Sequence, residues 1–286
     1  MPPGTWPAPR IFPYAGLTIR GAGAGQTIIP RSSPGALASG GFFHVTKANV
    51  TISDLTLRGW PVASGLSDDI GIYADNATGL RVLRVNIENM QGVGLFTEST
   101  TSSTAMSGGL FEDITIQNIV YRSNGYHGVG LWAYHGSNHN TYRRITVDGV
   151  NYAGIMIDAG TTVGTAASVD NNVFADIVIR HAARKALPGG AGTGYGFLFT
   201  GGSGNSVTRY EITDQSMGTA LAFGFDQSGI GSNANVLATG TVLRITSGDV
   251  VSFGGTRGNS LNGGTGSGNV SGLSGNTITN WPGLVP

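Results

Sequence analysis

The chain has 286 residues, of which 40% are hydrophobic and 11% are charged, and its 16 basic and 16 acidic side chains cancel at pH 7. This balance argues against a nucleic-acid partner, because nucleic-acid-binding proteins neutralise phosphates with a basic surface. The 48 glycines separate short apolar runs, so they punctuate a folded structure rather than mark a disordered, charge-rich chain. With no cysteine, disulfide scaffolds and thiolate metal sites are excluded.

Segments that direct a protein to a membrane are not apparent. No apolar run approaches the roughly 20 residues that cross a bilayer, so we expect no membrane partner. The first residues, Met1 to Gly4, lack the basic start and apolar core of a signal peptide. The chain is therefore cytoplasmic, exported by another route, or cut from a larger protein.

Taken in chain order, the sequence is organised by a repeat. An N-terminal arm, residues 1–15, precedes about nine coils, and residues 254–286 supply a Gly-rich last coil and a C-terminal cap. Short segments of alternating apolar and polar residues return every 29 to 32 residues, at Leu55–Leu57, Val85–Ile87, Ile114–Ile116, Ile145–Val147 and Ile177–Ile179. This period of two is typical of a strand with one buried face.

A second, Gly-led strand recurs within the same coils. Its copies are Gly71–Asp75, Gly94–Glu98, Gly130–Tyr134, Gly154–Asp158 and Gly196–Thr200. Four asparagines, 32, 33 and 30 residues apart, mark the same repeat at Asn140, Asn172, Asn205 and Asn235. No helical periodicity links the strands, and a β-sandwich does not explain the constant return of one motif. We therefore predict an all-β fold, a right-handed parallel β-helix (solenoid) of about nine coils, as a single domain over residues 1–286.

Residues 16–59 resemble the first coils of the pectate-lyase-like superfamily, from Gly16-Leu-Thr-Ile-Arg-Gly through Asn49-Val-Thr-Ile to Gly59. The later repeats resemble its generic β-helix repeat. This superfamily includes polysaccharide lyases, polygalacturonase-type hydrolases, epimerases, phage tailspikes and non-catalytic adhesins, so the resemblance implies a fold and not one reaction.

Strand alternation predicts where chemistry could lie. In the Gly-led strands the first and third residues after Gly should point inward and the second and fourth outward. One outward column then contains Tyr73, Phe96, Trp132, Met156 and Leu198, and the next contains Asp75, Glu98, Tyr134, Asp158 and Thr200. Sugars stack on aromatic rings, and paired carboxyl groups suit glycosidase chemistry. We expect Glu98, Asp75 and Asp158 to be catalytic, and Tyr73, Phe96, Trp132 and Tyr134 to bind substrate. The alternative is a solvated or covered outer face.

Other candidates lie at the strand corners. Asp68 and Asp69 precede one Gly-led strand and His127 precedes another, a partial match to the polygalacturonase branch that makes them alternative catalytic residues. His135 could contact substrate, and Arg184 and Lys185 begin a loop that could meet an acidic polysaccharide. His135 and His139 have no third ligand, so no metal site and no cofactor are expected, except Ca²⁺ if the protein is a lyase.

The functional prediction is a carbohydrate-active β-helix that cleaves an extracellular or virion-surface polysaccharide as a lyase or hydrolase, in the manner of a phage tailspike or depolymerase. The alternative is a non-catalytic adhesin or a shaft segment of a larger fibre. The expected partner is a polysaccharide or oligosaccharide, and the chain could form a homotrimer or part of a larger assembly.

Overall fold

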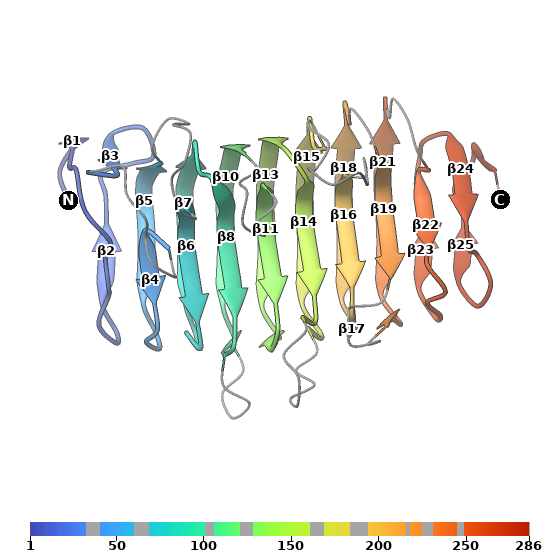
Figure 1. The fold of residues 1–286 in the computed structure, drawn as a ribbon, viewed down its shortest axis with the longest axis horizontal. Coiled ribbons are helices and arrows are strands. Elements are labelled where there is room, and N and C mark those ends of the chain that lie inside the picture. Colours follow the sequence, from blue (N-terminus) through green and yellow to red (C-terminus); the bar gives the residue numbers. More distant parts are fainter. Residues whose placement is uncertain are drawn as a thin grey trace.

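In the computed structural model, parallel strands lie side by side along one long axis, from the N-terminus at one end to the C-terminus at the other (Figure 1). The structure describes residues 1–32, 41–59, 69–100, 106–120, 128–160, 169–183, 194–215, 218–224, 231–244 and 249–285. Among these residues there is no helix, and therefore none that could cross a membrane.

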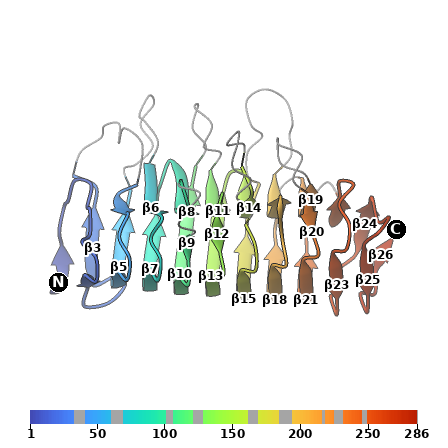
Figure 2. The ribbon, with the colours of Figure 1, turned by 90° about the horizontal axis from the view of Figure 1, so that it is seen from below.

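Two long sheets form the walls of the coil, as Figure 2 shows from a second direction. The first sheet has 12 strands, β1 (Gly4–Thr5), β2 (Thr18–Arg20), β3 (Thr27–Pro30), β5 (Thr51–Arg58), β7 (Arg81–Glu88), β10 (Leu110–Ile119), β13 (Thr141–Val150), β15 (Val173–Arg180), β18 (Ser206–Thr213), β21 (Val236–Leu243), β23 (Ser260–Asn262) and β25 (Thr277–Thr279). The second sheet has 10 strands, β4 (Phe43–Val45), β6 (Asp69–Asp75), β8 (Gly92–Glu98), β11 (Val129–Tyr134), β14 (Ala153–Asp158), β16 (Tyr195–Thr200), β19 (Thr219–Gly224), β22 (Val251–Phe253), β24 (Gly268–Ser271) and β26 (Leu284–Val285).

Successive coils pair in parallel, so the predicted parallel β-helix is confirmed. The repeated segments lie opposite one another, with Val85 against Ile114, Ile114 against Ile145, and Ile145 against Ile177. Each coil gives one strand to the second sheet, whose 10 strands compare with the about nine coils expected. Short strand pairs that sequence analysis missed form a third side, β9 (Met106–Ser107) with β12 (Ser137–Asn138) and β17 (Gly202–Ser203) with β20 (Ser232–Asn233).

The core lies inside the coils and follows the predicted alternation. Ile72, Leu95, Leu131, Ile155 and Phe197 are all fully buried in one cluster. Aromatic rings also stack from coil to coil, with centroids 4.7 Å apart in both Phe111–Tyr142 and Tyr142–Phe174. Because one coil covers the next, this core grows with every repeat.

A ladder of asparagines, which we call the Asn ladder, runs along one corner, and all of its members except the last are buried. Its six members are Asn140, Asn172, Asn205, Asn235, Asn259 and Asn276. From Asn172 onward, each side-chain oxygen accepts the backbone N–H of the preceding member, at 3.0 to 3.1 Å. The side-chain oxygen of Asn140 accepts the N–H of Gly109. The ladder therefore satisfies buried backbone donors that no strand pairs.

The outer face of the 12-stranded sheet carries a second column, which we call the Asp/Arg ladder. Its members are Asp54, Arg84, Asp113, Arg144, Asp176 and Arg209, each with φ between 52° and 59°. Each arginine binds the preceding aspartate through two hydrogen bonds, and for Arg209 and Asp176 these are 2.5 and 2.9 Å long. At its far end the column continues with Thr239, which has the same left-handed conformation, φ 56°.

The Gly-rich tail, residues 254–275, contains β23 and β24 and extends both sheets. Trp281 beyond it is 7% exposed and belongs to the core cluster. At the opposite end, the large hydrophobic residues of the arm are exposed, with Phe12 at 58% and Tyr14 at 81%. Large hydrophobic side chains are therefore buried at the C-terminal end and partly exposed on the N-terminal arm.

Candidate functional site

The predicted outward column forms a hydrophobic cluster separate from the core, which we call the outer cluster. It contains Phe96, Trp132, Met156 and Leu198, and Tyr73 and Tyr134 pack against it. The rings of Tyr73 and Phe96 stack with centroids 5.4 Å apart, and those of Phe96 and Trp132 are 5.2 Å apart. These contacts follow from register, which places Tyr73 opposite Phe96 and Phe96 opposite Trp132.

The expectation that this column forms an open aromatic face is wrong for its central members. Only 4% of Phe96 and 9% of Trp132 is exposed. Alternation fixes the direction of a side chain, but it does not tell whether other parts of the chain cover it. A sugar could reach these rings only at their margins, where Tyr73 and Tyr134 are half-buried.

The three predicted acids share one row at the carboxyl ends of their strands. Asp75 is paired directly with Glu98 across β6 and β8, and Asp158 is paired with Tyr134 across β14 and β11. Neighbouring parallel strands lie about 4.8 Å apart. Continuing the β8–β11 register places Tyr134 beside Glu98, so Asp158 lies two strands from Glu98.

Glu98 is the acid of this row that the protein surroundings perturb. It is 9% exposed, and the hydroxyl of Tyr73 donates a hydrogen bond to its Oε1. Burial raises the pKa of Glu98, and the charge of Asp75 raises it further, against the lowering effects of the Tyr73 hydrogen bond and of His135. A carboxyl with a raised pKa beside a second acid is the arrangement that acid–base catalysis uses.

Asp75 is oriented by the segment that follows β8. Its Oδ1 accepts hydrogen bonds from the backbone N–H of Thr100, at 3.1 Å, and from the Thr100 hydroxyl, at 2.8 Å. The side-chain amide of Asn76 donates to the same oxygen at 2.6 Å. These donors fix the orientation of the Asp75 carboxyl group beside Glu98.

Asp158, the third acid, is 9% exposed. Its Oδ1 accepts the backbone N–H of Gly160 at 3.0 Å, a short turn in which the aspartate binds its own backbone. Tyr134 covers this turn, since a Cβ on Gly160 would lie 2.5 Å from the Tyr134 ring. Asp158 therefore belongs to the same row and is oriented by the local backbone.

His135, expected to contact substrate, is instead 3% exposed. Its Nδ1 lies 2.8 Å from the carbonyl oxygen of Ser99, so Nδ1 carries the proton that is donated. The effect of His135 on the pKa of Glu98 places the two groups in electrostatic contact. His135 therefore supports the segment behind Glu98.

One ring of this surface was missed by sequence analysis. His44 in β4 stacks on Tyr73 with centroids 4.6 Å apart and lies opposite it in register. Both ring nitrogens are buried and have no hydrogen-bond partner among the described residues, and burial together with the charge of Arg10 lowers the pKa of His44. The signal is faint because Gly41 stands three residues before His44, where the other strands place Gly two residues before their ring.

The alternative corner and the basic loop lie outside the description. Asp68, His127, Arg184 and Lys185 are not among the described residues, and Asp69 is described only as the first residue of β6. Over the described part of the chain, no group of three or more acidic or histidine side chains is arranged to hold a metal ion.

Comparison with known proteins supports the fold. No protein-family model and no curated protein sequence matches the chain. Among solved structures, the catalytic domain of a GH87 α-1,3-glucanase in complex with nigerose is similar over 98% of this chain and 52% of its own, at 17% identity and a TM-score of 0.67. An alginate lyase from Paenibacillus sp. str. FPU-7 is similar over 100% of this chain and 91% of its own, at 16% identity and a TM-score of 0.64.

The Dettilon tailspike protein is more distant, with 12% identity, a TM-score of 0.50, and coverage of 97% of this chain and 61% of the tailspike. The chain thus spans about half the length of the glucanase domain and most of the alginate lyase. Identities this low show the parallel β-helix fold and leave the reaction open.

Proposed function

We propose that this protein is a carbohydrate-active β-helix that cleaves a polysaccharide by acid–base chemistry at the row of Asp75, Glu98 and Asp158. One observation carries the proposal: the Glu98 carboxyl is buried, bound by the Tyr73 hydroxyl and raised in pKa next to Asp75. The carbohydrate-active proteins of the same fold support the substrate class. Such substrates lie outside the cell or on a cell or virion surface, where we expect the protein to act.

In the proposed mechanism, protonated Glu98 donates its proton to the glycosidic oxygen as the bond to the leaving sugar breaks. A carboxyl about 5 Å from the acid acts as nucleophile and gives retention, whereas one about 6.5–9.5 Å away activates water and gives inversion. Asp75, on the neighbouring strand, fits the nearer role, and Asp158, two strands away, fits the farther one. The stereochemistry of the product therefore distinguishes the two acids.

The test is a screen of neutral and acidic polysaccharides, including α-1,3-glucan and alginate, for new reducing ends and for the absorbance of unsaturated sugars. Wild-type protein should produce reducing ends, and Glu98→Gln should lower the rate at least a hundredfold while keeping the shape of the side chain. Glu88→Gln is the matched control, because Glu88 lies on the other sheet and pairs with Arg58.

Full activity in Glu98→Gln would contradict the role of Glu98 as the acid, and Asp68, Asp69 and His127 would then be the better catalytic candidates. Unsaturated products would instead show a lyase, for which Ca²⁺ dependence should then be measured. The second candidate, a non-catalytic adhesin or shaft segment, is favoured by the covered outer cluster. It predicts binding to a polysaccharide without turnover by any variant.

A further inference from the structure

The Asp/Arg ladder is interrupted at one place. Register sets Arg84 between Asp54 and Asp113, and Arg144 between Asp113 and Asp176. Arg209 follows with Asp176 on one side, but the position on its other side is Thr239. The alternation of acid and base therefore ends at Arg209, within the sheet and before its last strands.

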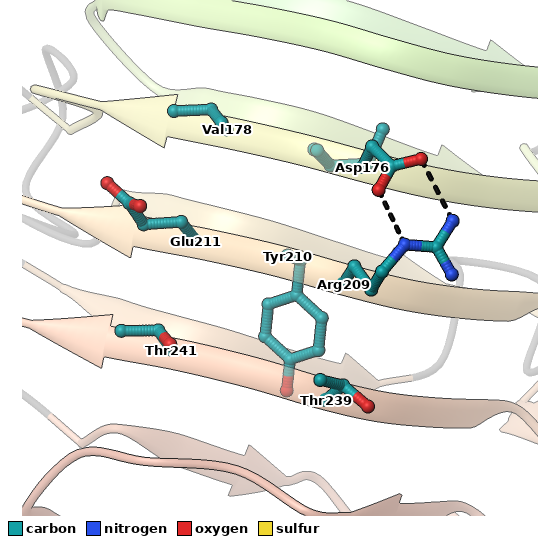
Figure 3. Close-up of a pocket in the computed structure, with 8 residues that line it drawn as sticks. Asp176, Val178, Arg209, Tyr210, Glu211, Thr239 and Thr241 are labelled. Carbon is teal, nitrogen blue, oxygen red and sulfur yellow. Dashed lines mark hydrogen bonds and ion pairs between the residues drawn. The ribbon is translucent and has the colours of Figure 1, made fainter.

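A shallow cavity of about 320 Å³, widely open to solvent, lies at this interruption, on the outer face of β15, β18 and β21. Figure 3 shows two rows of side chains along it, one with Asp176, Arg209 and Thr239 and the other with Val178, Glu211 and Thr241. The backbone of the strands forms the floor between them. The cavity is on the 12-stranded sheet and is therefore distinct from the acid row on the 10-stranded sheet.

The lining offers hydrogen bonds of both kinds without a dominant charge. The carboxylates of Asp176 and Glu211 accept, the guanidinium of Arg209 donates, and the hydroxyls of Thr239 and Thr241 do both. The charge of Asp176 is balanced by the guanidinium of Arg209 at 2.5 Å, and that of Glu211 by the guanidinium of Arg180 at 3.6 Å. This chemistry fits a neutral ligand rich in hydroxyl groups better than an anion or a cation.

Thr239 is also strained. Its φ of 56° lies in the left-handed region, where a β-branched residue is an outlier and an aspartate is better tolerated. An aspartate here would complete the ladder by pairing with Arg209. A strained residue beside a cavity, at the point where a regular array stops, is a feature expected at a functional position.

We propose that the cavity bounded by Arg209, Glu211, Thr239 and Thr241 binds a sugar unit of a neutral saccharide, on the face opposite the acid row. Its role is to hold a glycan chain without cleaving it. The proposal does not depend on catalysis, so it can stand if the proposed reaction fails.

The experiment is a methyl NMR titration with nigerose as the neutral probe, in Glu98→Gln protein so that the probe is not consumed. The Thr239 and Thr241 methyl signals should shift in a saturable way. The methyls of Thr115 and Thr146 are the matched control, because they occupy the same row as Thr241 in coils where the ladder is complete. Arg209→Ala should reduce the shift at Thr241 at least fivefold.

Thr239→Asp separates binding from folding. It should melt no lower than the parent, because it completes the ladder, and it should abolish the saturable shift at Thr241, because the new carboxylate pairs with Arg209 and adds a negative charge to the cavity. The proposal is overturned if the methyls of Thr239 and Thr241 shift no more than those of Thr115 and Thr146. It is also overturned if Thr239→Asp binds nigerose as the parent does, or if only an acidic disaccharide of galacturonate moves these signals.

Discussion

At the scale of single residues, Glu98 shows how one strand position acquires unusual chemistry. Its place at the end of β8 brings it beside Asp75, and the ring stack beneath it brings the Tyr73 hydroxyl to its carboxyl. Burial and the Asp75 charge favour the protonated acid, while the Tyr73 hydrogen bond favours the ionised one. The state of Glu98 at a given pH is therefore set by a balance that single substitutions can shift.

Tyr73→Phe tests this balance. Removing the hydroxyl removes an effect that lowers the pKa of Glu98, so the pKa should rise further. A general acid is active when protonated, and activity is lost as pH rises through its pKa. The high-pH limb of the rate profile should consequently move to higher pH in Tyr73→Phe, by about half a unit to one unit.

The same shift should be seen directly as the titration of the Glu98 carboxyl carbon by NMR. Tyr134→Phe is the control, because the Tyr134 hydroxyl is not among the groups that affect the Glu98 pKa. If the limb moves to lower pH, or moves equally in the control, Tyr73 does not act through Glu98.

Two tyrosines inside the coil, Tyr142 and Tyr210, differ in whether their hydroxyl groups are hydrogen-bonded. The Tyr142 hydroxyl lies 3.0 Å from Thr97 Oγ1, whereas the Tyr210 hydroxyl is buried with no hydrogen-bond partner among the described residues. Tyr142→Phe should lower the free energy of unfolding by about 1–2 kcal/mol, because Thr97 loses a partner. Tyr210→Phe should leave it unchanged or raise it by about 1 kcal/mol, because an unsatisfied buried hydroxyl is removed.

Urea denaturation of both variants measures the difference. Equal losses in Tyr142→Phe and Tyr210→Phe would show that the Tyr210 hydroxyl is satisfied in solution, for example by an internal water.

At the scale of the repeated element, the Asn ladder shows what sequence could and could not predict. Asn140, Asn172, Asn205 and Asn235 could be recognised because they recur every 30 to 33 residues. Asn259 and Asn276 could not, because the coils shorten to 24 and 17 residues at the C-terminal end. The ladder continues regardless, since it depends on stacking distance and not on the length of the loops.

The Asp/Arg ladder was missed for a different reason. Its members share a backbone conformation and a place in register, but their side chains change from acid to base at each coil. A search for repeated residue types overlooks this alternation, which becomes visible only once register is known. Its ion pairs are exposed; in the Arg209–Asp176 pair, 59% of the Arg209 side chain and 41% of the Asp176 side chain are accessible to solvent. Each such pair contributes little to stability and mainly fixes the orientation of the two side chains.

Asn205→Ala tests how much the Asn ladder contributes to the free energy of unfolding. Asn205 accepts the N–H of Asn172 at 3.0 Å and donates to the carbonyl oxygen of Val169 at 2.9 Å. Without it these buried groups lose their partners, so the free energy of unfolding should fall by about 2–4 kcal/mol. Asn269→Ala, at an exposed position, should change it by less than about 0.5 kcal/mol. Similar small losses in both variants would show that water replaces the ladder.

At the scale of the whole molecule, the fold could be predicted because every coil repeats the same inward pattern. The side chains predicted to point inward, such as Ile155, are buried in the core, because strand alternation alone sets their direction. The burial of Trp132 could not be predicted, because alternation gives the direction of a side chain and not how closely its neighbours pack around it. The position of the acid row was accessible from sequence, whereas the cavity at Thr239 required the register of three strands.

The ends of the coil are where its stability should be weakest, because a terminal coil has a neighbour on one side only. Trp281 covers the C-terminal end of the core, with its ring 6.5 Å from that of Tyr210 and close to Gly264, where a Cβ would lie 2.2 Å from Trp281 Cδ2. Trp281→Ala removes this cover, and a buried Trp-to-Ala change typically costs about 3–5 kcal/mol.

In a solenoid this loss should stay local. Hydrogen exchange should accelerate at least tenfold in β23 and β25 of Trp281→Ala, while β13 and β15 keep their protection, because each coil contacts only its neighbours. Trp6→Ala is the control at the other end, where Trp6 is 42% exposed and little change is expected. If protection fell equally from β5 to β25, the coils would unfold as one cooperative unit, and a cap at one end would then govern the stability of the distant acid row.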